Sequence, residues 1–213
     1  MKQTIFKTTT RTGAIFSDTE RQMEYLYVGD YGKENNIKAD FLGLSNEING
    51  VRHHEVDLSE KMVVTISTQK GCPMNCMFCD CPHYGFFGNL SAEDMAAEVT
   101  RAIVESHCTY TKRFNLHLAR MGEPSFNYEN IRKLLLRLPF IVADAGMKAD
   151  VIHPVFTTML PKAITKQELT SLLTRFCSFY KNLQYRGEAG LQLSINSTDE
   201  EQRNMLFRGK SHS

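Results

Sequence analysis

The chain has 213 residues, of which 42% are hydrophobic and 23% are charged, and its formal net charge is +1. This length is enough for one domain with a hydrophobic core, and the composition excludes a fibrous or low-complexity chain. No apolar run reaches the roughly 18 residues of a membrane span, and residues 1–7 lack the apolar stretch of a signal peptide, so we expect a cytoplasmic protein without membrane contact.

The first 61 residues have little regular pattern. Short β-like stretches at 4–9 and 25–28 are separated by Gly, Asn and Asp. Residues 1–60 carry seven Lys and Arg against ten Asp and Glu, which does not suit an RNA-binding arm, because such arms are basic. We interpret residues 1–61 as an irregular extension that covers one edge of a core domain at 62–213.

Strands and helices alternate from residue 62 onward. Residues 62–67 are apolar or β-branched, as in a buried strand, and Ser91 with Asp94 forms the capping-box pattern that opens a helix. The same signals predict strands at 114–118, 150–157 and 190–195, and helices around Ile131, Leu134, Leu135 and Leu138, after Thr165 with Glu168, and from Thr198. Such repeats imply parallel strands with helices outside them. The predicted fold class is α/β, a partial (β/α) barrel, since four units do not close the eight-stranded form.

A loop rich in cysteine follows the first of these strands. Cys72, Cys76 and Cys79 have the spacing C-x3-C-x2-C, and soft thiolates bind iron–sulfur clusters or zinc. A structural zinc site needs a fourth ligand, for which His83 or Cys81 is available. A cluster held by three cysteines instead leaves one iron open for a substrate or cofactor. The loop alone leaves both fillings open.

Candidate site residues also follow the other three strands. Gly122 and Glu123 come after the second strand, Thr157 ends the third, and Ser194 and Asn196 end the fourth. Because α/β sheets place their sites at the carboxyl ends of the strands, these residues should gather around the cysteine loop. This coincidence favours a cluster over zinc.

The cysteine loop resembles the signature of the radical SAM superfamily, C-x3-C-x-aromatic-C, with Phe78 in the aromatic position. Three more motifs are similar to the RlmN/Cfr-like branch, the adenosine methyltransferases of ribosomal and transfer RNA. They are Gly85-Phe-Phe-Gly-Asn89-Leu90, Met121-Gly-Glu-Pro-Ser-Phe-Asn127, and Leu193-Ser-Ile-Asn196 followed by Asp199, Glu200 and Arg203. The resemblance covers residues 62–210.

The resemblance implies two cofactors. Cys72, Cys76 and Cys79 would ligate three irons of a [4Fe-4S] cluster, and S-adenosylmethionine (SAM) would chelate the fourth. Reductive cleavage of SAM would then give a 5′-deoxyadenosyl radical, a chemistry that belongs to the cofactor. A small electron donor, such as a flavodoxin or a ferredoxin, would supply the electron.

The same resemblance implies contacts to SAM from the other strand ends. Glu123 would accept a hydrogen bond from the SAM ammonium group, and Gly122 would let the backbone come close to SAM. Ser194 and Asn196 would hydrogen-bond the ribose and carboxylate of SAM. Thr157 is a further candidate in the matching loop of the third strand.

The chain departs from this branch in several ways. The family commonly has Gly in place of Arg120 and His in place of Asn196. Its members carry an N-terminal helical RNA-binding domain, for which residues 1–60 are too short and too acidic. They also use a methyl-carrying cysteine well over a hundred residues beyond the Ser194 strand, whereas this sequence ends at Ser213. We therefore assign no catalytic cysteine, and we expect either a fragment or a chain that a partner chain or a dimer completes.

Three functions are left open. The first is a radical SAM enzyme of the RNA methyltransferase type, with RNA as its substrate. The second keeps the cluster and SAM but abstracts hydrogen from a non-RNA substrate, which needs no methyl-carrying cysteine. The third is a zinc-stabilised binding module.

Overall fold

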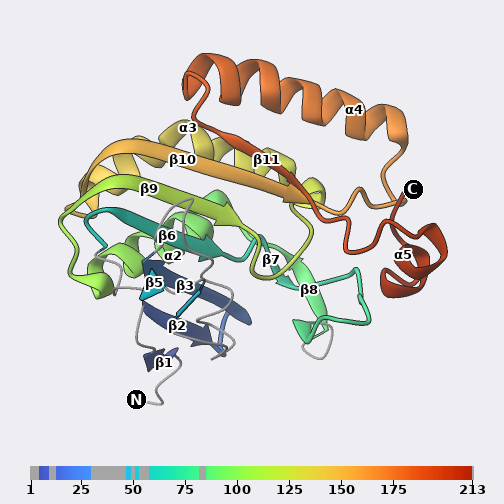
Figure 1. Ribbon diagram of the computed structural model, residues 1–213, viewed down its shortest axis with the longest axis horizontal. Helices are drawn as coiled ribbons and strands as arrows, with labels where there is room; N and C mark the ends of the chain where they lie inside the picture. Colours follow the sequence, from blue (N-terminus) through green and yellow to red (C-terminus); the bar gives the residue numbers. More distant parts are fainter. Residues whose placement is uncertain are drawn as a thin grey trace.

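The computed structural model describes residues 5–9, 13–29, 47–48, 51–52, 58–81 and 85–212. They contain a seven-stranded sheet in the order β1-β2-β3-β6-β9-β10-β11 (Figure 1). Its strands are β1 (Ile5–Thr9), β2 (Gly13–Asp18), β3 (Met23–Gly29), β6 (Lys61–Ile66), β9 (Tyr110–Leu118), β10 (Lys148–Thr158) and β11 (Gly190–Leu193). Two small antiparallel pairs join β4 (Glu47–Ile48) to β5 (Val51–Arg52) and β7 (Gln69–Gly71) to β8 (Phe86–Asn89).

Four strands of this sheet, β6, β9, β10 and β11, are parallel to one another. Helices α2 (Ala92–Ser106), α3 (Tyr128–Asp144) and α4 (Lys166–Arg175) connect them, and α2 and α3 cover one face of the sheet (Figure 1). A 3₁₀ turn, η3 (Pro124–Asn127), precedes α3, the π-helical η4 (Phe176–Gln184) extends α4, and α5 (Glu200–Leu206) follows β11. The predicted α/β class is confirmed, and within the described residues the sheet stays open.

The helices form where sequence periodicity predicts them. Ser91 Oγ accepts from the backbone N of Asp94 (3.0 Å), and Thr165 Oγ1 accepts from that of Glu168 (3.2 Å), so both predicted capping boxes are present. The apolar stripes face the sheet and are buried: Met95, Val99, Ala102 and Ile103 in α2, and Ile131, Leu134, Leu135 and Leu138 in α3. Across the described part of the chain, no helix is both long and apolar enough to cross a membrane.

The N-terminal segment is more regular than expected. Strands β1, β2 and β3 form an antiparallel meander, and β3 pairs with β6 through Leu26 and Thr65, so this meander continues the parallel sheet. In β2, Ala14 and Phe16 alternate with half-buried residues and join the main core. The extension thus covers the β6 edge by hydrogen bonding. The domain boundary after residue 61 stays a prediction.

A buried carboxyl group lies between α2 and the sheet. Glu98 is 1% exposed, and its Oε2 accepts from the backbone N of Ser67 (3.0 Å), while its Oε1 has no hydrogen-bond partner among the described residues. Burial raises the pKa of Glu98 well above its usual range, and the nearby Asp94 and Asp18 act in the same direction. Because its pKa is higher in the folded than in the unfolded chain, this group lowers stability as the pH rises above the ordinary carboxyl range.

Replacing Glu98 with Gln should therefore stabilise the fold at neutral pH. Gln keeps an acceptor for Ser67 N and removes the buried charge, so we expect a gain of about 1–2 kcal/mol at pH 7. The gain should shrink as the pH falls below about 4, where the unfolded carboxyl is also protonated. Urea unfolding at both pH values measures it, and an equal effect at both would contradict the assignment.

Candidate functional site

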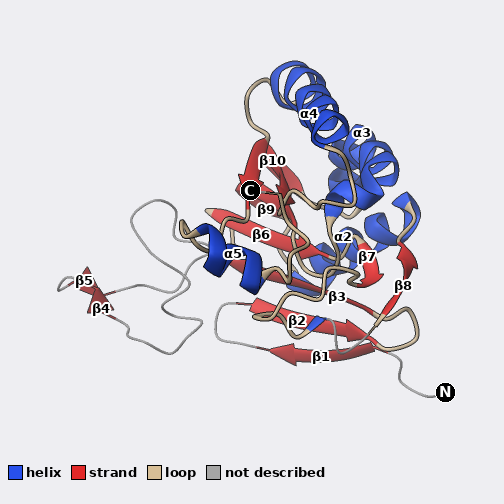
Figure 2. Cartoon of the chain, turned by 90° about the vertical axis from the view of Figure 1, so that its right-hand side faces the viewer, coloured by secondary structure: helices blue, strands red, loops and turns tan. Residues whose placement is uncertain are grey.

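A cavity of about 290 Å³ lies where the carboxyl ends of β9, β10 and β11 face the cysteine loop. Figure 2 looks onto these strand ends, with α5 and the β7–β8 pair in front of the sheet. All eight predicted site residues line this strand-end cavity: Cys72, Cys76, Cys79, Gly122, Glu123, Thr157, Ser194 and Asn196. The structure thus brings together residues from four separate segments, as the strand-end positions predict, while their individual roles stay predictions.

The β7–β8 pair holds the base of the cysteine loop. The backbone N of Cys72 donates to the backbone O of Gly85 (3.1 Å), which joins the loop to the start of β8. Gly71 has φ +72°, and a Cβ at this position would lie 1.9 Å from the Gly85 oxygen. Only glycine fits there, so the entry to the loop is fixed by backbone packing.

The walls around the three thiols are largely apolar. Met74, Cys76, Met159 and Phe207 form a buried cluster, and Cys72 packs against it. Burial raises the pKa of Cys76 to about 12, and burial also raises the pKa of Cys72. The neutral thiol forms of Cys72 and Cys76 suit this low-dielectric site, and a cationic metal group would favour their thiolate forms.

Cys81 also lines the cavity, beside Cys79. The Cys81 thiol donates to the backbone O of Arg120 (3.7 Å), and its interaction with the Cys79 thiol lowers the pKa of Cys79 and raises that of Cys81. Among the described residues, the ligand atoms that lie within 4.8 Å of one another are those of Cys79, Asp80 and Cys81. The second zinc-ligand candidate, His83, lies outside the described residues.

The donor set fits a cluster better than a single ion at the three predicted cysteines. One zinc ion with bonds of about 2.3 Å would draw its thiolates to within about 4 Å of one another. The sulfur atoms of Cys72, Cys76 and Cys79 are not grouped within 4.8 Å, although all three face one cavity. A cluster binds each thiolate to a different iron, so its ligands are naturally farther apart.

Glu123 is the most highly connected polar residue of the cavity. It is 3% exposed, and its Oε1 accepts from Ser125 Oγ (2.6 Å), Ser125 N (3.1 Å) and Thr158 Oγ1 (2.7 Å), while its Oε2 accepts from Met159 N (3.0 Å). Burial raises the pKa of Glu123, and the hydrogen bonds from Ser125 and Thr158 oppose this effect. Oε2 has one of these four donors, so it keeps the capacity to accept another. The bracing role of Ser125 is not apparent from the sequence.

A neighbouring residue of β7 explains why position 122 is a glycine. Gly122 has φ +101°, and a Cβ here would lie 2.7 Å from Cβ of Gln69. Gln69 is buried, its Oε1 accepts from the backbone N of Glu123 (2.9 Å), and its Nε2 donates to Asn89 Oδ1 (2.7 Å). Gln69 therefore fixes the Gly122-Glu123 turn, a role that sequence reasoning missed because it depends on how β7 approaches the end of β9.

The β11 side of the cavity is more open. Strand β11 ends at Leu193, two residues before its predicted end, although Ser194 N still donates to Thr158 O (2.9 Å). Asn196 is exposed and has φ +59°, a left-handed conformation that Asn tolerates better than most residues. Thr157 Oγ1 donates to Gln192 Oε1 at 3.4 Å, a long bond. These side chains keep polar atoms available at the cavity wall.

Arg120, which stands where the RlmN/Cfr-like branch commonly has Gly, also lines the cavity. Its guanidinium forms an ion pair with Glu24 of β3, and the side chains are 29% and 13% exposed. Glu24 is held in turn by Ser67, whose Oγ donates to the Glu24 backbone O (2.6 Å). The N-terminal strands thus contact the site through Arg120.

Comparisons with known proteins show which proteins this chain is similar to. No family model matches the chain. The dual-specificity RNA methyltransferase RlmN of Campylobacter fetus subsp. fetus is 31% identical over 121 residues, 56% of this chain and 33% of that protein. The RlmN of Aliarcobacter butzleri is 27% identical over 153 residues, 70% of this chain and 37% of that protein. Over these segments the chain is similar in sequence to RlmN RNA methyltransferases. It spans about a third of the length of these two RlmN relatives.

One solved structure has a fold similar to that of this chain. The crystal structure of a radical SAM methyltransferase from Sphaerobacter thermophilus matches with a TM-score of 0.51 over 98% of this chain and 65% of that chain, at 17% identity. At this identity the match concerns the fold alone. The RlmN relatives add the sequence similarity that the fold match lacks.

Proposed function

We propose that the chain holds a [4Fe-4S] cluster through Cys72, Cys76 and Cys79 and binds SAM at the adjoining strand ends. It would form the cofactor-binding part of a radical SAM enzyme related to RNA methyltransferases. The observation that carries this proposal is the strand-end cavity, in which the predicted ligands Cys72, Cys76 and Cys79 face the ends of three parallel strands. The RlmN relatives support RNA as the substrate class.

The bound cofactors would supply the reductive cleavage of SAM and the radical chemistry that follows. The chain's own residues bind and orient. The apolar wall of Met74, Met159 and Phe207 packs against the thiols and would limit their contact with water. Glu123 is braced through Oε1 and offers Oε2 to the ammonium group of SAM. Gly122, whose missing Cβ makes room for Gln69, would bring the backbone of the turn close to SAM.

The other SAM contacts would come from Ser194, Asn196 and Thr157, whose polar atoms line the open side of the cavity. We assign no methyl-carrying cysteine in this chain. Transfer of a methyl group would require that cysteine from a continuing segment, a partner chain or a dimer. The electron would come from a small cytoplasmic donor such as a flavodoxin or a ferredoxin.

One observation favours a second candidate, a zinc-stabilised binding module. The ligand atoms of Cys79, Asp80 and Cys81 lie within 4.8 Å of one another, a spacing that a single ion can occupy. This group shares only Cys79 with the proposed cluster ligands. The two candidates therefore differ in which metal the purified chain retains and in which thiols hold it.

The proposal predicts cleavage of SAM. After anaerobic reconstitution with iron and sulfide, the chain should bind about four irons and form 5′-deoxyadenosine when SAM and dithionite are added. Metal analysis and chromatography of the nucleoside products measure both. One zinc per chain, with no iron–sulfur absorption and no 5′-deoxyadenosine, would contradict the proposal and support the zinc module.

A further inference from the structure

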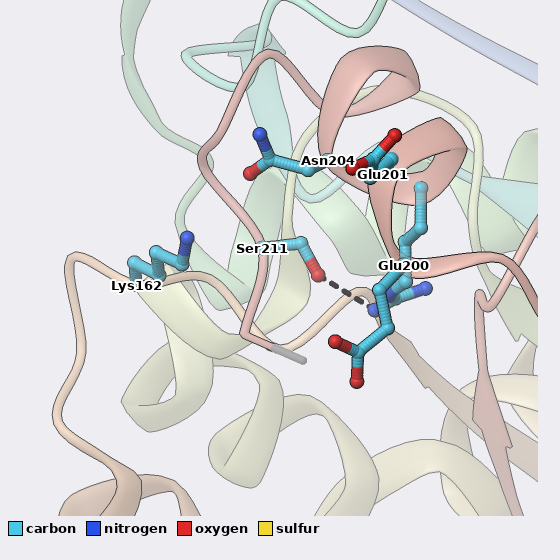
Figure 3. A pocket seen from close by; sticks show the side chains of 6 residues that line it. Lys162, Glu200, Glu201, Asn204 and Ser211 are labelled. Carbon is cyan, nitrogen blue, oxygen red and sulfur yellow. Dashed lines mark hydrogen bonds between the residues drawn. The ribbon is translucent and has the colours of Figure 1, made fainter.

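Arg203 of α5 makes hydrogen bonds to three segments that are separate in the sequence. Its guanidinium donates to the backbone O of Ser194 (2.9 Å) and Ile195, to Ser211 Oγ (2.6 Å) and to the backbone O of Met159 (3.3 Å). In Figure 3 a dashed line marks the hydrogen bond that Ser211 Oγ accepts, at the edge of a second pocket that Lys162 and Glu200 also line. A planar guanidinium with five donors can bind several acceptors at once.

Helix α5 depends on contacts of this kind for its position. It has seven residues, none of them buried, and isolated helices of this length are not stable in water. Phe207, directly after it, is fully buried, and the Arg203 guanidinium lies 4.8 Å from the centre of its ring. Arg203 therefore fastens both the helix and Phe207 to the ends of β10 and β11.

Residues 206–210, at the end of α5 and directly after it, contact the cysteine loop in three places. Met77 N donates to the backbone O of Leu206 (2.9 Å), Lys210 Nζ donates to the backbone O of Pro73 (2.7 Å), and the rings of Phe78 and Phe207 meet edge to face with 5.4 Å between their centres. One contact thus involves a residue between the first two cysteines, and two involve residues between the second and third. Phe207 also packs against the buried Cys76.

We propose that Arg203 is a positioning residue that keeps the cysteine loop packed against α5 and the strand-end cavity. By fixing α5, Phe207 and Lys210, it holds the loop against the strand-end cavity before any cofactor binds. This inference deepens the proposed function, because the loop is the proposed cluster site, but its structural content does not depend on a cluster. Loss of the guanidinium should free residues 73–78 while the sheet stays folded.

The metal-free protein provides the test. Arg203→Met keeps the aliphatic stem and removes every donor, so we expect alkylation of Cys76, followed by peptide mass spectrometry, to become about tenfold faster. Hydrogen exchange at the Met77 amide should accelerate to a similar extent, because its acceptor is in α5. Arg203→Lys, which keeps a charge over Phe207 but loses the planar fork, should restore part of the protection.

Two further variants make the test specific. Arg208→Met changes an exposed arginine of the same segment and should leave both rates at the wild-type value. Lys210→Met removes only the exposed contact to Pro73 and should raise the Cys76 rate by about threefold. Unchanged rates in folded Arg203→Met, or equal increases in Arg208→Met, would overturn the proposal. If Arg203→Met does not fold, an unchanged rate in Lys210→Met would overturn it.

The alkylation and hydrogen-exchange rates of the metal-free protein do not depend on the proposed cofactors. A chain that binds no iron but shows the predicted protection pattern would contradict the proposed function and support the role of Arg203. A chain that binds iron but shows no effect of Arg203→Met would support the proposed function and contradict the role of Arg203.

Discussion

Replacing Cys76 with Ala should reduce the iron bound after anaerobic reconstitution from about four per chain to less than one. Cys76 is a buried member of the apolar cluster, and its thiol is one of the three predicted ligands that line the strand-end cavity. Two remaining thiols would leave two irons of a cluster without a protein ligand. Iron assay after desalting, together with the visible absorption of the thiolate–iron chromophore, measures the loss.

Cys177→Ala is the matched control for this variant. Cys177 is a half-buried thiol of η4 that packs against the main core, away from the cavity. We expect it to retain full iron, and unfolding of both metal-free variants by urea separates lost ligation from lost packing. Full iron retention in Cys76→Ala would remove Cys76 from the ligand set.

Replacing Glu123 with Ala should weaken both the fold and SAM binding. The substitution leaves the backbone N of Ser125 and of Met159 without their acceptor inside a buried site, and we expect a loss of about 2–4 kcal/mol in unfolding free energy. The ammonium group of SAM would lose its acceptor as well, so its affinity should fall about tenfold to a hundredfold. Urea unfolding and equilibrium dialysis with SAM measure the two effects.

Ser125→Ala separates bracing from binding. Ser125 supports Glu123 through its hydroxyl but does not line the cavity. We expect it to cost about 1 kcal/mol in unfolding free energy with less than a threefold change in SAM affinity. If both variants weaken SAM binding equally, Glu123 acts only by supporting the turn. Unaltered affinity in Glu123→Ala would place it outside the SAM site.

Local patterns predict the helices and the parallel strands well. The apolar stripe of α2 and its capping box at Ser91 are encoded within a few residues, and so is the alternation of strands and helices. The pairing of β3 with β6 is different, because short strands with polar edges carry a weak signal and their partner lies far along the chain. Strands β1 and β3 are therefore predicted only as β-like stretches at 4–9 and 25–28, and β2 is not predicted.

In the candidate site, too, local features are predicted from the sequence and contacts between distant segments are not. The sequence places Glu123 at a strand end, but its bracing by Thr158 and the support from Gln69 depend on how separate segments approach one another. Arg203 is visible as part of a motif, yet its hydrogen bonds to Ser194 and Ser211 follow from the position of α5. Residue types at strand ends predict which residues gather, whereas their partners are set by tertiary packing.

The most direct test of the central claim is the electron paramagnetic resonance spectrum of the reduced, iron-reconstituted chain before and after addition of SAM. If three cysteines hold a cluster whose fourth iron faces the strand ends, the reduced protein should give a paramagnetic cluster signal whose g values change when SAM binds. Glu123→Ala should need more SAM for the same change, and Cys76→Ala should give no signal. A protein that gives no such signal, or one whose signal SAM leaves unchanged, would contradict the account.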